Sequence, residues 1–399
     1  MKTIEDIIDN SLCIGCGLCE ALVPELKMAV NNKGFLVPQG DFSSIKDEDN
    51  ETIIKICPGV NQHNEIPAKT KNERLWGKVL QSKFGCSSDM QVRFKGSSGG
   101  VLSAIAIYLL EHRMITCVLQ IGVDKEDPIR NVARTTHTRT EIINSAGSRY
   151  APASLLTSLV KALEQGEKVL IIGKPCDIAG VRNFLRKYPI YSPQVPYLFS
   201  FFCAGQPSYL ATDKLLNRIG CNSEDVKEFH YRGEGWPGYA TAITHSNRRH
   251  SCSYEESWGE ILGRQIHFRC KICPDGIGIF ADIVCGDYWH VKNGEPDFTE
   301  SDGRSLILAR TARGEQLLNL MIKEGAIKAE DFEVKNLELI QKYQANRRIV
   351  IGARILAFTI AKRIKLNFRG FGFLSNLFFS KSKTVLSNFY GTFKRANKI

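Results

Sequence analysis

The chain has 399 residues, 43% of them hydrophobic and 24% charged, a composition that excludes a mainly disordered protein. Its net charge of +11 comes from 53 Lys and Arg against 42 Asp and Glu. Twelve of the basic residues and none of the acidic ones lie in 347–399, so the rest of the chain is almost neutral and nucleic-acid binding is not expected.

The first residues mix charges and have no apolar core, so we expect no secretory signal peptide, a cytoplasmic location and reduced cysteines. The chain has no run of about 18 apolar residues, so no membrane-spanning helix is predicted. Thirteen is an odd number of cysteines, and short fixed spacings among cytoplasmic cysteines are typical of metal binding or redox chemistry.

The N-terminal unit, residues 1–66, contains C-x-x-C-x-x-C, the spacing that wraps a [4Fe–4S] cluster. Such a run normally continues to a fourth cysteine before a proline, but Val23 stands in that place. In two-cluster ferredoxins that cysteine serves the other cluster, so a distant Cys-Pro is needed here, and Cys57 followed by proline supplies it. A zinc knuckle is the alternative. The sequence predicts a ferredoxin-like domain with one cluster, held by Cys13, Cys16, Cys19 and Cys57.

A polar linker over 66–73 leads into a body in which strands and helices alternate. The patterns predict helices over 100–111, 152–165 and 178–186 and strands over 117–123, 168–173 and 197–202. Short strands with Gly-rich turns are expected over 226–287, and one strand and two helices over 305–346. The predicted fold is mixed α/β (α+β), and the predicted domains are 1–66, 74–166, 167–346 and a basic helical tail over 347–399.

A second group of cysteines is scattered through the body. Cys270 and Cys273 form a lone C-x-x-C, which needs two further thiolates to hold a metal centre. Cys176 and Cys203 each follow a predicted strand, so both emerge at one edge of the sheet if those strands are neighbours. The spacing alone leaves a cluster, a zinc site and unrelated buried thiols open.

Six segments of the body accompany the N-terminal cysteine motif, in one order along the chain: 97–100 (SSGG), 147–150 (GSRY), 169–176 (VLIIGKPC), 202–207 (FCAGQP), 269–273 (RCKIC) and 281–289 (ADIVCGDYW). Together they resemble the family of coenzyme F-420 hydrogenase/dehydrogenase beta subunits, in which F-420 is a deazaflavin hydride carrier. The family includes subunits of hydrogenase and formate dehydrogenase, chlorophyll-cycle reductases, and bacterial members associated with surface-polysaccharide genes. The resemblance implies FAD and one or two [4Fe–4S] clusters, the second on Cys176, Cys203, Cys270 and Cys273.

The resemblance also implies residues for the flavin. The stretch 97–100 precedes a helix, where free amides and the positive helix end suit a pyrophosphate, and a helix cap with Gly for packing is the alternative. Arg149 and Lys174 are candidates for a flavin phosphate or the reduced flavin, or else are solvated charges. Asp282 and Asp287 orient the cofactor or pin a local turn. The candidate cofactor residues are Ser97, Ser98, Gly99, Gly100, Ser148, Arg149, Tyr150, Lys174, Asp282 and Asp287.

The expected function is that of an oxidoreductase coupling hydride transfer, from F-420 or a similar carrier, to one-electron transfer through clusters, because a flavin can do both. Its partner would be that diffusible carrier or a redox protein, and its second substrate a polysaccharide-pathway precursor or another organic molecule. Three departures from the family pattern leave the substrate open: Lys174 for Thr, Asp177 for Gln and Ala204 for His. The alternatives are an electron-transfer subunit without its own substrate chemistry and a zinc-bearing scaffold protein.

The tail has helical periodicity from residue 347 onward. At 100° per residue, an arc of about 80° contains Arg347, Arg354, Lys362, Lys365 and Arg369. This arrangement predicts an interfacial helix on the anionic inner face of the cell membrane. Packing on the body or on a partner protein is the alternative.

Overall fold

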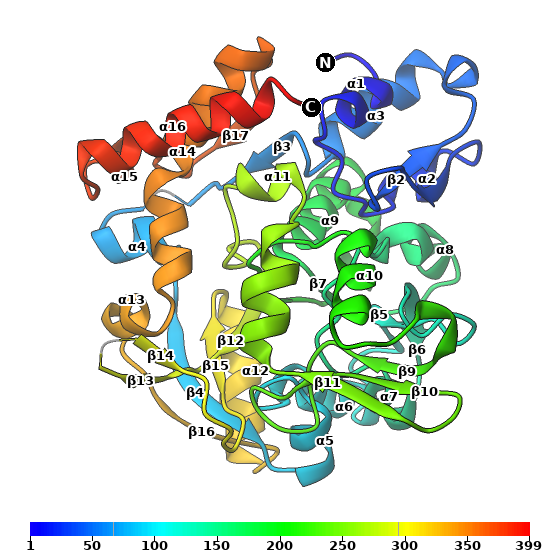
Figure 1. Ribbon diagram of the computed structural model, residues 1–399, viewed down its shortest axis with the longest axis vertical. Helices are drawn as coiled ribbons and strands as arrows, with labels where there is room; N and C mark the ends of the chain where they lie inside the picture. The colour runs from blue at the N-terminus through cyan, green and yellow to red at the C-terminus, as the bar shows by residue number, and fades with distance from the viewer. Residues whose placement is uncertain (67, 294) are drawn as a thin grey trace.

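The computed structural model describes residues 1–66, 68–293 and 295–399, and its centre is an eight-stranded sheet (Figure 1). The strands are β4 Gln81–Ser87, β5 Cys117–Val123, β6 Asn131–Thr136, β7 Val169–Gly173, β8 Tyr197–Phe201, β12 Ile283–Asp287, β15 Ser305–Ala309 and β16 Ile327–Asp331. Their order is β16-β4-β15-β12-β8-β7-β5-β6. The four middle strands β12, β8, β7 and β5 are parallel, and antiparallel strands flank them on both sides. The body is therefore mixed α/β, as predicted.

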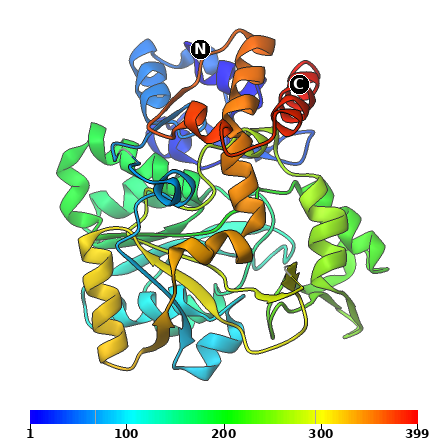
Figure 2. The same cartoon turned by 90° about the vertical axis from the view of Figure 1, so that its left-hand side faces the viewer.

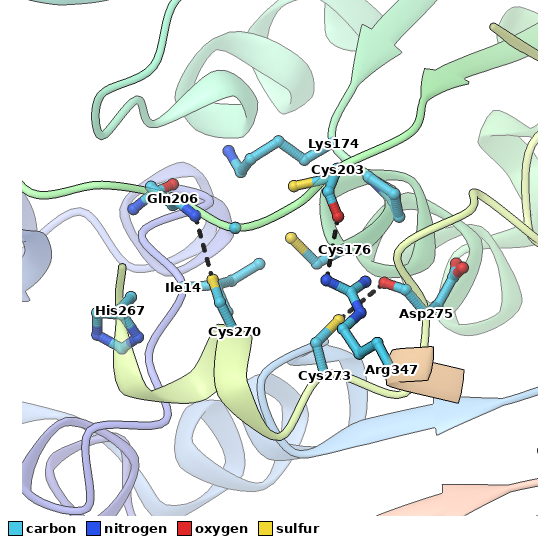
Figure 3. A pocket seen from close by; sticks show the side chains of 12 residues that line it. Ile14, Lys174, Cys176, Cys203, Gln206, His267, Cys270, Cys273, Asp275 and Arg347 are labelled. Atoms are coloured by element: carbon cyan, nitrogen blue, oxygen red, sulfur yellow. Dashed lines mark hydrogen bonds between the residues drawn. The ribbon is translucent and has the colours of Figure 1, made fainter. Parts of the chain in front are cut away.

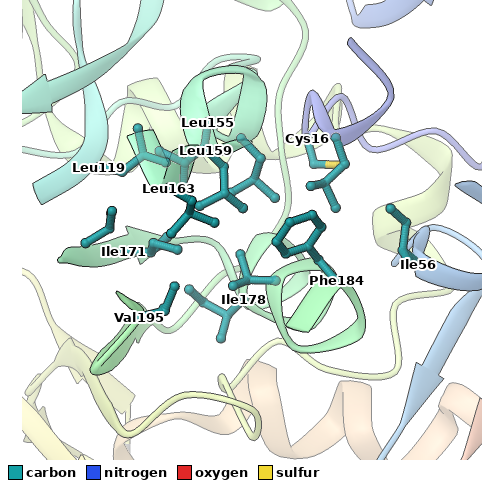
Figure 4. Close-up of a cluster of buried hydrophobic side chains, with 14 of the residues drawn as sticks. Cys16, Ile56, Leu119, Leu155, Leu159, Leu163, Ile171, Ile178, Phe184 and Val195 are labelled. Atoms are coloured by element: carbon teal, nitrogen blue, oxygen red, sulfur yellow. The ribbon is translucent and has the colours of Figure 1, made fainter. Parts of the chain in front are cut away.

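Both faces of the sheet are covered, which is why its middle strands are continuously apolar. The cluster on one face joins Leu170 and Phe199 to the helices α6 Val101–Glu111, α7 Arg139–Asn144 and α12 Ala312–Lys323. On the other face Ile171 and Leu198 pack against α8 Leu159–Glu164 and α9 Pro175–Lys187 (Figure 4). That second cluster also contains Cys16 and Ile56, so the N-terminal unit shares a core with the sheet.

The two ends of the chain lie side by side at one end of the molecule (Figures 1 and 2). The N-terminal unit comprises α1 Ile4–Asp9, α2 Leu18–Leu22, β1 Lys27–Val30, β2 Leu36–Gln39, α3 Asp47–Ile56 and β3 Asn61–His63. The tail comprises α14 Lys342–Lys362, β17 Asn367–Arg369, α15 Phe373–Leu377 and α16 Ser382–Ala396. β17 pairs in parallel with β3, and a common apolar cluster contains Leu12, Phe358 and Phe368. The tail is thus part of the folded body.

The remaining helices and strands lie outside the eight-stranded sheet. A three-stranded sheet is formed by β9 Val226–His230, β10 Ala240–Thr244 and β11 Arg249–Cys252, and a hairpin by β13 His290–Lys292 and β14 Glu295–Asp297. The other helices are α4 Lys71–Trp76, α5 Met90–Lys95, α10 Tyr209–Arg218, α11 Phe268–Lys271, α13 Leu337–Ile340 and a π-helical turn over Glu255–Ile261. The strands expected over 117–123, 168–173 and 197–202 and the helix over 100–111 are confirmed to within a residue or two.

Three expected elements differ in the structure. The helix predicted over 152–165 is wrong in its first part, where a 3₁₀ turn over Leu155–Ser158 precedes α8. The carbonyls at the start of the predicted helix accept other hydrogen bonds, because the side chain of Asn131 donates to the carbonyls of Ala151 and Pro152 at 3.1 and 3.2 Å. The helix expected from 178 begins at Pro175, which suits the first helical turn. The segment 305–346 contains β16 as a second strand.

Two of the predicted domain boundaries can be compared with the helices of the structure. The linker over 66–73 includes residue 67, which lies outside the described residues, and α4 begins at Lys71. The boundary between 346 and 347 lies within α14, which continues unbroken from Lys342 to Lys362. The division into four parts otherwise stays a prediction.

The helical arc of five basic residues predicted for the tail is wrong. α14 ends at Lys362 because Arg363 has a positive φ of 57°, and the segment that follows becomes β17. Arg347 is only 4% exposed. Arg354 donates to the side chain of Asn388 at 2.9 Å, and Lys362 donates to the carbonyl of Ile399 at 2.6 Å. No helix in the described parts of the chain is long and apolar enough to cross a bilayer.

Candidate functional site

The four cysteines of the N-terminal unit come together around one loop. Cys13, Cys16 and Cys19 surround the start of α2, and Cys57 follows directly after α3. Burial and the neighbouring thiol of Cys57 raise the pKa of Cys13 to about 12. The loop is tied to the body because the amide of Leu156 donates to the carbonyl of Cys16 at 2.8 Å. The structure therefore assembles the predicted set, including its distant fourth member.

A glycine is required inside this loop. Gly17 has a φ of 90°, and a Cβ on it would lie 2.6 Å from Cγ2 of Thr157. Only glycine combines this backbone conformation with so close an approach to the body. The loop can therefore bring its cysteines against the sheet.

The second set lies where the predicted strands end. β7 and β8 are parallel neighbours, so Cys176 in the first turn of α9 and Cys203 after β8 emerge at the same edge. Cys270 in α11 and Cys273 just after it face them across a small enclosed cavity (Figure 3). The amide of Gln206 donates to Sγ of Cys270 at 3.4 Å. All thirteen cysteines are free, so none of these eight thiols is taken by a disulfide.

A single zinc ion requires closely spaced ligand atoms. Zn–S bonds of about 2.3 Å require ligand atoms within about 4.6 Å of one another. Among the described residues the group whose ligand atoms all lie within 4.8 Å is Cys117, His137 and Glu167, at the opposite edge of the sheet from the second set. Neither cysteine set closes to that spacing. The thiols as placed therefore do not form a ready-made site for one zinc ion.

The two sets are adjacent. Ile14, the residue after Cys13, lines the cavity of the second set. Arg269, the residue before Cys270, is 1% exposed and donates to the carbonyls of Gly59 and Pro58 at 2.5 and 3.0 Å. These carbonyls lie one and two residues beyond Cys57. Arg269 thus fixes the loops of both sets with a single guanidinium.

Burial raises the pKa of all four thiols of the first set and of Cys176, Cys203 and Cys270 in the second. Burial and the neighbouring thiol of Cys270 raise the pKa of Cys203 to about 12. A thiol with such a pKa is protonated at neutral pH, and coordination to a metal is what converts it to a thiolate. These cysteines are therefore suited to hold a metal centre rather than to act as free nucleophiles.

Nine of the ten predicted cofactor residues lie at one edge of the sheet. We call this the carboxyl edge: the edge at which the parallel strands β5, β7, β8 and β12 end. Asp287 ends β12 and lies opposite Ser305 of antiparallel β15. Ser305 bonds to the side chain of Ser98 and to the amide of Gly99, and the adjacent Ser97 accepts from the amide of Ser148. Ligands of α/β sheets bind outside this edge.

The donors at the carboxyl edge are already partly used. The guanidinium of Arg149 donates to the side chain of Asn131 and to the carbonyls of Pro128, Arg130 and Phe229. The amide of Gly99 is held by Ser305 at 2.9 Å. These contacts favour a structural role for both residues. Space remains beside Gly147, where a Cβ would meet no atom closer than 3.8 Å.

Lys174 and Asp177 stand beside the second cysteine set. Nζ of Lys174 lies 2.9 Å from the carboxylate of Asp177, which also accepts from the backbone amide of Lys174 at 3.0 Å. Lys174 lines the cavity, and against the opposing effect of burial its pKa is raised by Asp177 and by the nearby thiols of Cys176 and Cys203. Lys174 and Asp177, two of the three departures from the family pattern, therefore form an ion pair at the cysteine site.

Asp282 is the one candidate cofactor residue that does not lie at the carboxyl edge. It precedes β12, at the sheet edge opposite to the cysteines, and its carboxylate is fully buried. It accepts from the amide of Leu198 at 2.8 Å and pairs with Arg313 and Arg182 at 2.8 and 3.2 Å. These contacts favour the structural alternative for Asp282.

Three residues of the site were missed by the sequence reasoning. Arg347 of α14 reaches the second cysteine set from the tail. Arg232, 3% exposed, makes a two-point pair with Asp287 at 2.9 and 2.8 Å. His267 lines the cavity, and burial together with Arg269 lowers its pKa to about 3, so it is neutral. No spacing in the sequence marks them, because each reaches the site through the tertiary fold.

A sheet with two neighbouring sets of four free thiols at its carboxyl edge is typical of a redox protein rather than of a hydrolase or a binding module. Two models of one family, described as "Coenzyme F420 hydrogenase/dehydrogenase, beta subunit", match the chain: the N-terminal model over residues 84–161 and the C-terminal model over residues 166–335. Together they cover more than half of it. The chain belongs to this family, and we therefore class it as an oxidoreductase.

Named relatives agree with this family. The chain is 25% identical over 363 residues to the coenzyme F420-dependent sulfite reductase of Methanocaldococcus jannaschii, covering 86% of this chain but only 52% of that protein. It is 27% identical over 271 residues to the coenzyme F420 hydrogenase subunit beta of Methanococcus voltae, covering 66% of this chain and 89% of the relative. It is 23% identical over 263 residues to the F420-dependent formate dehydrogenase 1 subunit beta of Methanococcus maripaludis, covering 65% and 64%.

A solved structure supports the fold. A chain of the F420-reducing [NiFe] hydrogenase complex from Methanosarcina barkeri aligns with a TM-score of 0.55 and 21% identity. The alignment covers 70% of this chain and 91% of the other. At this identity the likeness establishes the architecture of the sheet and its helices.

Proposed function

We propose that the chain is a flavin- and iron–sulfur-dependent oxidoreductase that exchanges hydride with coenzyme F-420 or a similar carrier and passes single electrons through two [4Fe–4S] clusters. Cys13, Cys16, Cys19 and Cys57 would hold the first cluster. The second would be held by Cys176, Cys203, Cys270 and Cys273. The alternative is that the chain is an electron-transfer subunit of a larger redox complex without its own substrate chemistry. This alternative is supported by the relatives that are named as subunits.

One observation carries this proposal: two sets of four free cysteines lie next to each other. A test of fit is provided by Arg347, whose Nε and Nη2 are buried beside the second set and have no hydrogen-bond partner in the described parts of the chain. Buried donors without acceptors are costly, and an anionic cluster supplies acceptors at this place. The residues present therefore fit the group.

The flavin proposal rests on the family and on the carboxyl edge. When bound, a flavin exchanges two electrons as hydride and passes them on singly. The protein would hold it near Ser97, Ser148, Tyr150 and Asp287, which share the carboxyl edge with the cysteines. Lys174, already paired with Asp177, would present a positive charge where reduction adds negative charge. The second substrate, an organic molecule such as a polysaccharide-pathway precursor, is part of the same proposal.

We expect the chain, purified anaerobically at full length, to contain about eight iron atoms, about eight acid-labile sulfides and about one flavin. Metal analysis, sulfide assay and flavin fluorescence after denaturation measure all three. About four iron atoms would remove the second cluster from the proposal, and zinc without iron would contradict it. Reduction of organic substrates with an artificial electron donor would separate the enzyme from the electron-transfer subunit.

We also propose that the tail contacts an anionic membrane surface. The contact would be made by the last two helices, α15 and α16, and not by the arc of basic residues predicted from the sequence. Leu374 and Phe378 are 79% and 88% exposed, and the exposed Lys381 and Lys383 follow them directly. Exposed apolar side chains beside lysines are typical of interfacial helices. No acidic residue occurs in 347–399 to weaken the attraction.

Replacing Leu374 and Phe378 together with serine is expected to reduce cosedimentation with vesicles containing phosphatidylserine at least threefold, since both apolar anchors are lost. Leu339→Ser, at an exposed position in α13, is the matched control and should bind as the original chain does. Point substitutions are preferable to deletion of 347–399, because that deletion would remove buried Arg347 and Phe358. Equal binding by the double variant and the original chain would contradict the lipid contact.

A further inference from the structure

Arg347 is a buried cation in the tail that faces the second cysteine set. It lies in the second turn of α14, is 4% exposed, and lines the cavity together with the four cysteines. Figure 3 shows its guanidinium directed into the space between them, with Nη1 donating to the carbonyl of Cys203 at 3.1 Å. Its other two nitrogens, Nε and Nη2, have no partner within the described residues.

The positive charge of Arg347 is not directly paired with a carboxylate, although Asp275 lines the same cavity. No acidic oxygen lies within 4.0 Å of it in the ranges that the structure describes, whereas Lys174, the other cation of the cavity, is paired with Asp177 at 2.9 Å. A buried charge without a counter-ion is expensive. A stable fold therefore implies that something negative faces Arg347 when the protein is complete.

Gly276 makes room for this guanidinium. A Cβ at position 276 would lie 1.3 Å from Nη2 and 2.3 Å from Cζ of Arg347. The carbonyl of Gly276 accepts from the amide of Cys203 at 2.8 Å, so the glycine also positions a cysteine of the set. Its φ is not positive, so alanine would be hindered here by Arg347 and not by the backbone.

We propose that Arg347 sets the reduction potential of the cluster on the second cysteine set, with Gly276 as the residue that admits it. This inference rests on the proposed assignment of a cluster to Cys176, Cys203, Cys270 and Cys273. One-electron reduction makes the site more negative by one unit, and no bond forms or breaks in the step. A fixed positive charge with two free N–H donors stabilises the reduced form more than the oxidised form, because net charge and hydrogen bonds to the sulfurs set the potential.

The consequence is that the tail takes part in the redox site. α14 packs against α16 and begins beside the body, so the segment that supplies Arg347 is the same one that closes the fold around the N-terminal unit. A flavin can deliver an electron to this set only if the potential of the set is high enough. Arg347 therefore acts on the potential through its charge and its N–H donors, and it is not a group that reacts.

The test is a redox titration of the full-length, cluster-loaded protein, followed by electron paramagnetic resonance of the reduced clusters. Arg347→Met is expected to lower the equilibrium constant for reduction of one cluster at least tenfold, which is about 59 mV for a one-electron couple. Arg347→Lys should give a smaller shift in the same direction, because it keeps the charge but loses the planar donors. The first cluster serves as the internal reference and should keep its potential.

Two further variants keep the proposal falsifiable. Gly276→Ala retains the charge but displaces the guanidinium, so it should also lower the potential. Arg363→Met removes an equivalent charge from the exposed residue that ends the same helix, away from the cysteines, and should leave both potentials unchanged. An unchanged potential in iron-loaded Arg347→Met would overturn the proposal, and if that variant does not load iron, unchanged potentials in Arg347→Lys and Gly276→Ala would do the same. Four iron atoms in the unsubstituted chain would instead overturn the assignment of the second cluster.

Discussion

Replacing Cys57 with alanine is expected to remove about half of the iron, lowering it from about eight to about four atoms per chain. Cys57 is the one member of the first set that comes from outside the loop containing Cys13, Cys16 and Cys19. Without it the cluster would keep three thiolates and an open position in a buried site. Iron and labile-sulfide analysis of the anaerobically purified variant measures the loss.

The complementary variant and a control make this result specific. Cys273→Ala should remove the other half of the iron, because it breaks the second set and leaves the first complete. Cys252→Ala changes a half-buried thiol in β11, away from both sets, and should keep all the iron. Cys57→Ala that still contained eight iron atoms would show that the distant Cys-Pro is not a ligand.

The cysteine sites could be predicted because their positions depend on local rules. The spacing of Cys13, Cys16 and Cys19 is a property of one loop, and the loop forms as expected. Cys176 and Cys203 follow two consecutive strands joined by a helix, and strands connected in this way usually lie side by side in parallel. β7 and β8 do pair in this way, which brings the two thiols to one edge.

Arg347 could not be predicted because its position depends on the whole fold. As a helix in isolation, the tail places Arg347 on the same side as Arg354 and Lys362, a pattern that resembles a lipid-facing stripe. In the structure each of these side chains bonds to a different part of the protein. A buried arginine and a solvated arginine have the same sequence signature, and only packing distinguishes them.

The roles of the candidate flavin residues also depend on packing that the sequence does not show. A basic residue in a family motif suits a phosphate, which favours Arg149, but its donors hold the carbonyls of Pro128, Arg130 and Phe229. Asp282 and Asp287 are five residues apart and lie at the two ends of one strand, so they face opposite edges of the sheet. Sequence proximity therefore grouped two aspartates that the strand separates.

Replacing Asp282 with asparagine is expected to lower the free energy of unfolding by about 3 kcal/mol, a fall in Tm of about 4 °C, while leaving the iron and flavin content unchanged. The carboxylate is fully buried and accepts from Leu198 and Thr311 in addition to pairing with Arg313 and Arg182. Asparagine keeps the shape but leaves two guanidinium groups without their counter-ion. Both arginines are partly exposed and can turn toward water, which places the loss at the lower end of the range for a broken buried pair.

Two matched aspartates decide between the structural and the cofactor role. Asp331→Asn disrupts an exposed pair with Lys83 and should change stability by less than about 0.5 kcal/mol, since exposed ion pairs contribute little. Asp287→Asn at the carboxyl edge should lower the flavin content, because Asp287 lies beside the serines proposed to hold the flavin. Thermal unfolding and flavin content are measured on the same anaerobic samples. Loss of flavin from Asp282→Asn with an unchanged Tm would reverse the two roles, and it would place the flavin at the edge of the sheet that is remote from the cysteines.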